Sequence, residues 1–177
     1  MSNEQNIQIN MANIPQLLAH AIALENEASE RYADLADLME AHNNYDVASL
    51  FKKMSGIEQL HVNHIQEMVK RHRIKALPTV TYHWLSPEGP ETTDTTDLHY
   101  LMNPRQALKL AMYNEQRACD YYANIAAHTQ DEETRRLAQE LSAEEAEHVG
   151  MVKVWMDKYP EPEADWDQDD DPPFQPD

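Results

Sequence analysis

The distribution of proline constrains the fold of this chain more than any other feature. No proline occurs between Gln16 and Leu77, and none occurs between Arg105 and Tyr159. The whole chain of 177 residues has ten prolines and only three glycines. Long stretches that lack these residues and are rich in Ala, Leu, Met, Glu, Gln and Lys predict α-helix. Each stretch is longer than one ordinary globular helix, so each must be divided.

A polar break divides each stretch, which predicts two helical hairpins. The breaks are residues 42–44 and residues 128–131. Residues suited to cap helix N-termini support these limits: Asn13, Asn103 before Pro104, and the pair Thr129 and Glu132 at capping-box spacing. The four predicted helices span about 14–41, 45–72, 104–128 and 131–158.

The segment between the hairpins, about residues 74–103, is rich in residues that break helices. A helix of 25 residues is roughly 37 Å long, and a linker of this length can run back along it. We therefore expect an all-α, ferritin-like four-helix bundle over residues 1–160, with two antiparallel hairpins joined by a long crossover. Residues 161–177 contain eight acidic residues, four prolines and no basic residue. This composition predicts an irregular acidic tail.

The charge balance excludes several classes of partner. Lys and Arg total 14 and Asp and Glu total 32, which gives a net charge of −18. A nucleic-acid partner is not expected, because its phosphates require a basic face. A membrane is not expected either, since no apolar run approaches the length of a span and the N-terminus shows no signal peptide. The single cysteine, Cys119, excludes an internal disulfide and a Cys₄ metal site. A cytoplasmic location is the expectation.

The chain contains an internal repeat in which the second hairpin resembles the first. At an offset of 87, the second predicted helix aligns with the fourth, and the matched pairs include Glu58 with Glu145 and His61 with His148. At an offset of 90, the first helix aligns with the third, and Glu25 and Tyr32 match Glu115 and Tyr122. The repeated residues are expected on the faces where the two hairpins meet.

Polar residues interrupt the apolar stripe of every helix at one level of the predicted core. Glu25 and Glu58 are equidistant from the first turn, and Glu115 and Glu145 are equidistant from the second. Four buried carboxylates would repel one another, whereas two divalent cations would balance their charge. Each Glu-x-x-His pair also places an oxygen and a nitrogen on one helix face. The pattern therefore predicts a di-metal carboxylate site.

A purely structural interpretation of these residues is the alternative. With 18 Glu and nine His in the chain, about one Glu-x-x-His pair is expected by chance. The prediction depends on the joint pattern, because both pairs follow the repeat, lie on apolar stripes and occur at matched heights. Other charged residues fall off these stripes and are interpreted as solvated: Glu27, Glu30, Glu144 and Glu147, with His64 as a surface histidine.

The set of glutamates, histidines and tyrosines resembles the ferritin-like di-iron proteins, and among them the rubrerythrin family. The resemblance covers about residues 14–158. It implies that Glu58 and Glu145 bridge two metal ions and that Glu25, Glu115, His61 and His148 complete the coordination, with the pairing of terminal glutamates and histidines left open. It also implies that Tyr32 and Tyr122 hold carboxylate ligands in place through their phenol groups.

Three departures from related proteins refine this expectation. The chain lacks the rubredoxin-like Cys₄ domain that delivers electrons in rubrerythrin itself. Met112 and Ala118 stand where rubrerythrin has an additional glutamate one turn from the third-helix ligand. Gln59 stands where bacterioferritin has its haem-binding methionine, so no haem is expected.

The resemblance implies a non-haem oxidoreductase that reduces peroxide or dioxygen with two iron ions, although manganese is also possible. The expected partners are a separate electron donor and a second copy of the chain in a homodimer. One alternative is a ferroxidase or iron-handling protein. Another is a non-catalytic scaffold that docks on a partner through its acidic tail, which contains Trp166 and Phe174. A tail that folds back on its own bundle is the competing interpretation.

Overall fold

Four α-helices make up most of the chain. A computed structural model describes residues 13–80 and 99–168, and no strand occurs among them. The helices are α1 (Ile14–Ala41), α2 (Tyr45–Arg71), α3 (Pro104–His128) and α4 (Glu132–Met156). These limits agree with the prediction to within two residues. None of the helices in the described part of the chain is long and apolar enough to cross a lipid bilayer.

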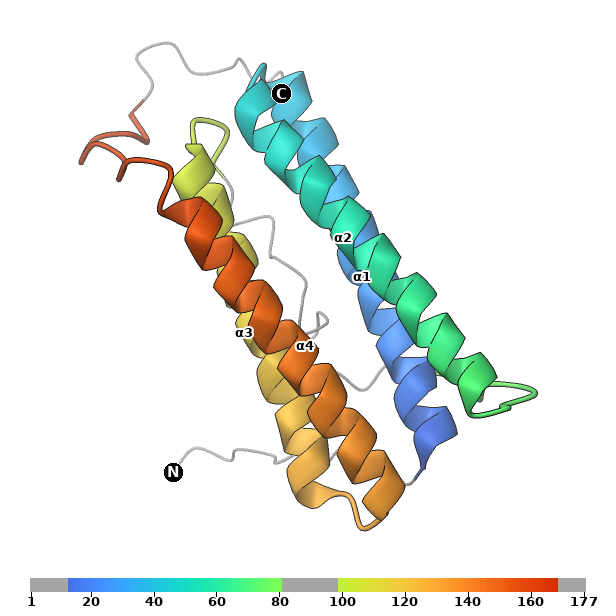
Figure 1. Ribbon diagram of the computed structural model, residues 1–177. Coiled ribbons are helices and arrows are strands. Elements are labelled where there is room, and N and C mark those ends of the chain that lie inside the picture. The colour runs from blue at the N-terminus through green and yellow to red at the C-terminus, as the bar shows by residue number, and fades with distance from the viewer. Residues whose placement is uncertain (1–12, 81–98, 169–177) are drawn as a thin grey trace, which may run out of the picture.

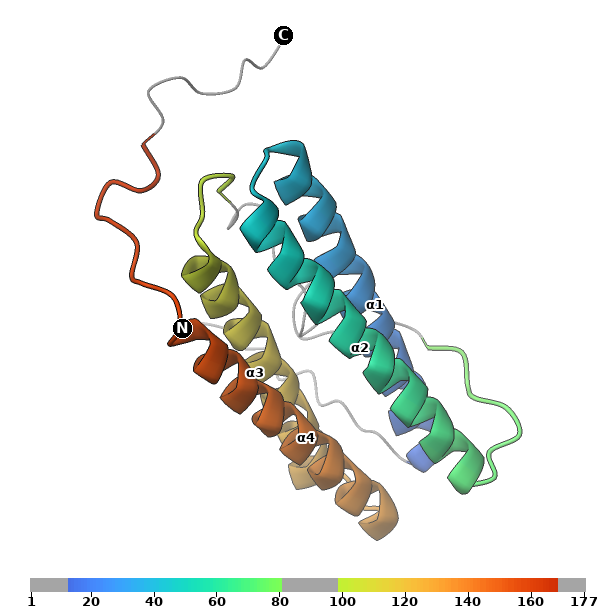
Figure 2. The same ribbon diagram turned by 45° about the horizontal axis from the view of Figure 1, so that its top comes forward.

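The helices form two antiparallel hairpins that lie against each other (Figure 1). Helices α1 and α2 form the first hairpin, and α3 and α4 form the second; both views show the two members of each pair side by side (Figure 2). The α2 helix ends at the opposite end of the bundle from the start of α3 (Figure 1). The predicted all-α, ferritin-like bundle is confirmed, while residues 81–98 of the crossover lie outside the described residues.

Side-chain and backbone caps explain most of the helix ends. The side chain of Asn13 accepts a hydrogen bond from the backbone of Gln16, and Asn103 forms a complete capping box with Gln106. The predicted pair of Thr129 and Glu132 is wrong, because Asp131 caps α4 instead. Its carboxylate accepts from both the backbone and the hydroxyl of Thr134, at 2.8 and 2.6 Å.

Two apolar clusters fill the bundle, and each draws residues from all four helices. The cluster near the α3–α4 turn includes Leu17, Ile65, Tyr122 and Leu141. The cluster near the α1–α2 turn includes Met39, Phe51, Leu108 and Val152. Since each cluster joins both hairpins, burial of these side chains holds the hairpins together. The polar layer predicted from the sequence lies between the two clusters.

The first part of the tail folds back on the bundle. Tyr159 and Trp166 pack against the apolar cluster near the α1–α2 turn. Glu161 forms ion pairs with Arg105 and Lys109, each at 2.8 Å. The described part of the predicted tail, residues 161–168, is irregular and is anchored to its own chain. Phe174 lies outside the described residues.

Candidate metal centre

Four glutamates, one from each helix, lie in the middle of the bundle. Glu25, Glu58 and Glu115 are each 1% exposed, and Glu145 is 2% exposed. They occupy the gap in the apolar stripes between the two clusters, where the helical pattern would otherwise place Leu or Ala. Burial of a carboxylate is costly unless a cation or hydrogen-bond donors compensate it. Such a layer therefore requires an explanation beyond packing.

In the first hairpin, two carboxylates meet one histidine. Nδ1 of His61 lies 3.4 Å from Oε2 of Glu25 and 3.6 Å from Oε2 of Glu58. The Glu-x-x-His spacing of α2 places Glu58 and His61 on one face, and Glu25 approaches from α1 at the same height. The equal distance of Glu25 and Glu58 from the turn between the helices produces this match.

The second hairpin repeats the arrangement. Nδ1 of His148 lies 3.4 Å from Oε2 of Glu115 and 3.1 Å from Oε2 of Glu145. These contacts show which glutamate lies beside which histidine. Each terminal glutamate, Glu25 or Glu115, lies beside the histidine of its own hairpin.

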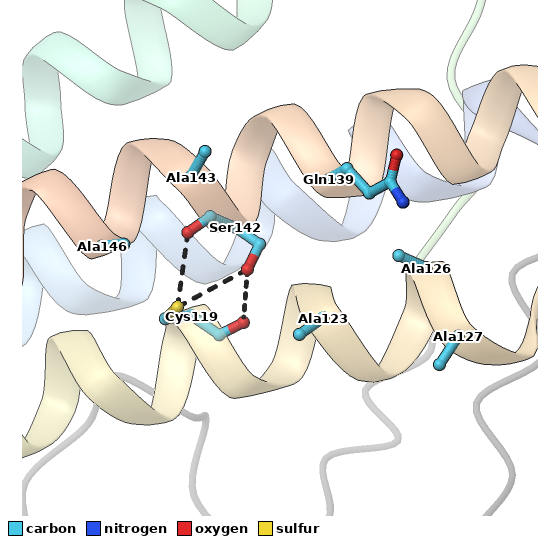
Figure 3. A pocket seen from close by; sticks show the side chains of 8 residues that line it. All are labelled: Cys119, Ala123, Ala126, Ala127, Gln139, Ser142, Ala143 and Ala146. Carbon is cyan, nitrogen blue, oxygen red and sulfur yellow. Dashed lines mark hydrogen bonds between the residues drawn. The ribbon is translucent and has the colours of Figure 1, made fainter.

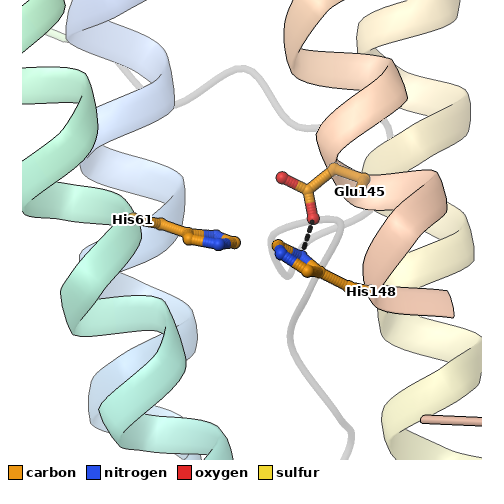
Figure 4. Close-up of side chains that lie close together, drawn as sticks. All are labelled: His61, Glu145 and His148. Carbon is orange, nitrogen blue, oxygen red and sulfur yellow. Dashed lines mark hydrogen bonds and ion pairs between the residues drawn. The ribbon is translucent and has the colours of Figure 1, made fainter. Parts of the chain in front are cut away.

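The two histidines bring the two halves together. The rings of His61 and His148 stack with centroids 4.1 Å apart and planes inclined by 23° (Figure 4). They project toward each other from α2 and α4 (Figure 4). Their side chains are 17% and 15% exposed, whereas the carboxylates are almost fully enclosed. The histidine side is therefore the side on which the layer comes closest to solvent.

The pKa values of the buried groups reflect their crowding. Burial raises the pKa of Glu25 to about 8 and that of Glu145 to about 7. Burial, with repulsion from Glu115, also holds the pKa of Glu58 well above its usual range. Without a cation, these carboxyl groups resist ionisation at neutral pH.

The two stacked histidines differ in their affinity for a proton. Burial lowers the pKa of His148, but hydrogen bonds to Glu115 and Glu145 outweigh this effect and raise it to about 10. Burial, followed by repulsion from His148, lowers the pKa of His61. Two imidazolium rings in contact would repel each other, so one ring carries the positive charge that the carboxylates attract.

The donor atoms of this layer fit a pair of divalent metal ions. Oε2 of Glu25, both carboxylate oxygens of Glu58 and Oε2 of Glu115 are buried, and within the described structure the Nδ1 atoms of His61 and His148 lie 3.4–3.6 Å from the Oε2 atoms of these three glutamates, too far for a well-formed hydrogen bond. Two ligand atoms about 2.1 Å from one ion and at right angles to each other are about 3.0 Å apart. The histidine nitrogens lie 3.1–3.6 Å from their carboxylate oxygens, which is close to that spacing. Two groups of potential ligands have their ligand atoms within 4.8 Å of one another: Glu25, Glu58 and His61, and His61, Glu145 and His148.

The two tyrosines flank the polar layer from opposite sides, Tyr122 in the cluster near the α3–α4 turn and Tyr32 in the cluster near the α1–α2 turn, and they have different partners. The hydroxyl of Tyr122 donates to Oε1 of Glu25 across the interface between the hairpins, at 3.4 Å. The hydroxyl of Tyr32 accepts from the side chain of Asn114, also at 3.4 Å. Asn114 is 1% exposed and directly precedes Glu115, yet the sequence analysis did not single it out. Its repeat partner is Leu24, so no symmetry signal indicated a polar role.

A shallow groove in the second hairpin does not belong to this centre. It is lined mainly by alanines, together with Cys119, Gln139 and Ser142 (Figure 3). The thiol of Cys119 donates to the carbonyl oxygen of Ser142, and Ser29 and Ser55 make the matching bond in the first hairpin. Cys119 therefore occupies a repeat position that joins the two helices of its hairpin.

His64 is an exposed surface histidine, as expected, but it also has a partner on the other hairpin. Its Nε2 lies 3.3 Å from Oε1 of Glu144, which links α2 to α4 across the two hairpins. No sequence pattern indicated this contact, because neither residue has a polar counterpart in the repeat. The structure thus places an ion pair next to the histidine side of the metal centre.

The fold and this layer define a ferritin-like four-helix bundle with a candidate di-metal site at its centre. The chain belongs to the rubrerythrin family, because the sequence model of that family matches residues 16–158. A similar solved structure is that of an uncharacterized conserved protein from Magnetospirillum magnetotacticum MS-1. It is 44% identical, covers 85% of this chain and 97% of its own length, and superposes with a TM-score of 0.63. Comparison with curated proteins gives no significant match.

Proposed function

We propose that this protein is a non-haem di-iron oxidoreductase that reduces peroxide, or alternatively dioxygen, with electrons from a separate donor protein. The observation that carries the proposal is the pair of matched Glu–Glu–His groups, buried in one layer and stacked through His61 and His148. Membership of the rubrerythrin family supports iron as the metal. The peroxide substrate rests on the family resemblance alone.

Each residue of the layer has a defined task under this proposal. Glu58 and Glu145 would bridge the ions, while Glu25 with His61 and Glu115 with His148 would complete the two coordination spheres. When bound, two Fe(II) ions would supply the two electrons that, with two protons, convert one peroxide to two waters.

The residues around the layer orient a ligand carboxylate and control how an oxidant reaches the centre. The Tyr122 hydroxyl holds one oxygen of Glu25 and so restricts the orientation of that ligand. The apolar clusters above and below keep bulk water away from the carboxylates. A small oxidant would approach from the histidine side, where the rings of His61 and His148 retain some exposure.

We propose that electrons reach the site from a separate donor. The sequence has a single cysteine, so it cannot build a Cys₄ iron centre of its own. We therefore include an external electron donor in the proposal. A second copy of the chain remains the proposed partner for a homodimer.

Anaerobic titration with Fe(II), followed by stopped-flow oxidation, tests the proposal. We expect saturation at two ions per chain and rapid oxidation of one di-iron(II) pair by one peroxide. The reaction should then stop until a reductant is added. Parallel mixing with dioxygen identifies the preferred oxidant. Saturation at one ion or none would refute the di-metal centre.

Repeated additions of Fe(II) and oxidant separate this function from iron storage. An oxidoreductase of this kind should retain only its two site metals after several cycles. Soluble accumulation of tens of ions per chain would instead establish a ferroxidase with a storage role. If neither oxidant reacts within minutes, the site is structural or holds another metal such as manganese.

A further inference from the structure

The contact between His64 and Glu144 lies outside the six residues assigned to the metal centre. Nε2 of His64 and Oε1 of Glu144 are 3.3 Å apart, and the side chains are 45% and 34% exposed. The contact joins α2 to α4, the same two helices that supply His61 and His148. An imidazole nitrogen and a carboxylate oxygen therefore face each other in a position that solvent reaches.

The position of this pair relative to the buried centre follows from the helical spacing. His64 is three residues, or nearly one turn, after His61, and Glu144 directly precedes Glu145. The pair thus lies beside the partly exposed histidine side, which is where the centre comes closest to solvent.

The internal repeat shows that this polar contact is a departure from symmetry. The offset of 87 relates His64 to Met151 and Glu144 to Ile57. Both counterparts are apolar and half-buried. The repeat therefore places a polar pair at one of two equivalent positions and apolar residues at the other. A hydrated cation that approaches the centre finds ligand atoms at the polar pair.

We propose that His64 and Glu144 form an outer site that captures a divalent metal ion from solvent and passes it to the buried centre. The proposal rests on the di-metal function proposed above. The donor types and their 3.3 Å separation match the His–Glu pairs inside the bundle. Two protein ligands and retained waters would bind an ion weakly, and weak binding suits rapid transfer. The net charge of −18 would raise the local concentration of cations.

The rate of metal uptake tests this proposal separately from the amount of metal bound. Apo protein is mixed anaerobically with Co(II), whose visible absorption reports coordination, and then with Fe(II). We expect His64→Gln and Glu144→Gln to slow uptake by roughly tenfold, in the range typical of electrostatic guidance. Both variants should still reach two ions per chain. Combining the substitutions should add little, because each disrupts the same site.

Matched controls remove effects of charge and of histidine content. Glu67→Gln removes one exposed carboxylate of α2, and His72→Gln removes an exposed histidine at the end of that helix. Neither change should slow uptake. Wild-type rates in His64→Gln and Glu144→Gln would overturn the outer site alone. A final metal content below two ions per chain in these variants would also overturn the outer site, because His64 and Glu144 would then belong to the buried centre itself. No uptake by the wild type would refute the proposed function.

Discussion

The imidazole ring of His61 stacks on that of His148 at a centroid distance of 4.1 Å, and the Nδ1 atom of each ring faces two carboxylates of its own hairpin. The stack therefore marks the boundary between two equivalent ligand groups.

Removal of either histidine should reduce metal binding. His61→Ala and His148→Ala each delete one of the two nitrogen ligands, so we expect metal content below two ions per chain after anaerobic loading. Glu145→Ala should have a similar effect, because it also leaves His148 without its closest carboxylate at 3.1 Å. Metal analysis after gel filtration measures the result. His64→Ala is the control and should keep two ions, and equal losses in all variants would show that the ligand face of α2 is misassigned.

The hydrogen bond from Tyr122 to Glu25 should tune metal affinity. Tyr122→Phe removes the donor that holds Oε1 of Glu25, while the ring still fills the core. We expect a loss of about 10-fold to 100-fold in affinity, as is common when a group that orients a metal ligand is removed. Competition with a chromophoric chelator gives the affinity. Tyr113→Phe is the matched control, since Tyr113 is 61% exposed and lies away from the layer.

Apo protein should become less stable as pH rises from about 5 to 8. The folded state keeps protons on Glu25 and Glu145 up to pKa values of about 8 and 7, whereas the unfolded chain loses them near 4.5. The folded state therefore binds more protons in this window, and the free energy of unfolding must fall with pH. The slope is about 1.4 kcal/mol per pH unit for each proton concerned. His148, with its raised pKa, acts in the same direction above pH 6.5.

The stabilisation of the protein by bound metal should increase as the pH rises. Metal ions displace the protons from these carboxyl groups, so metal affinity rises with pH. Urea unfolding at pH 5, 6, 7 and 8, with either chelator or Co(II), measures the difference. We expect the gap between loaded and apo protein to widen with pH. An apo stability that rises steadily over this range would contradict the crowded-carboxylate interpretation.

The ligand layer was predictable because it depends on periodicity and symmetry. Glu58 and His61 lie on one helix face by spacing alone, and the repeat transfers the same relationship to Glu145 and His148. Matched distances from the turns then place Glu25 and Glu115 at the same height. These relationships follow from the geometry of regular helices, so they can be predicted without knowing the tertiary contacts.

Contacts that break the repeat were not predictable. Asn114 bonds to Tyr32, and His64 bonds to Glu144, yet neither contact has a polar counterpart in the other half. The cap of α4 was also missed, because Thr129 and Asp131 are both suitable caps and only the local backbone decides between them. Such contacts depend on how the two hairpins and their turns meet in space.

Arg105 should stabilise the fold by binding the C-terminal end of α4 and the residues that follow it. Its Nη1 donates to the carbonyl oxygens of Met156 and Tyr159, at 2.7 and 3.0 Å, at the C-terminus of α4. Arg105→Ala leaves these carbonyls without their charged donor, so we expect a loss of about 1–3 kcal/mol in the free energy of unfolding. Lys109→Ala removes only an exposed ion pair with Glu161 and should cost less than about 1 kcal/mol. Equal effects of the two changes would show that Arg105 acts only through Glu161.

The end of α2 offers a stabilising change that tests the backbone directly. Arg73 has a φ of 55°, in the left-handed region that favours glycine, and its N–H bonds to the carbonyl oxygen of Lys70. The next residue, Ile74, bonds back to Val69, which completes a Schellman turn. Arg73→Gly should therefore stabilise the protein by about 1 kcal/mol, because an L side chain in this region costs roughly 1–2 kcal/mol.

Asn43 occupies the same position after α1 with a φ of 60°, and Asn43→Gly should gain less stability because asparagine tolerates this conformation. Urea unfolding of both variants, in apo form and at one pH, gives the comparison. A destabilised Arg73→Gly variant would show that the arginine side chain contributes more than its strained backbone costs.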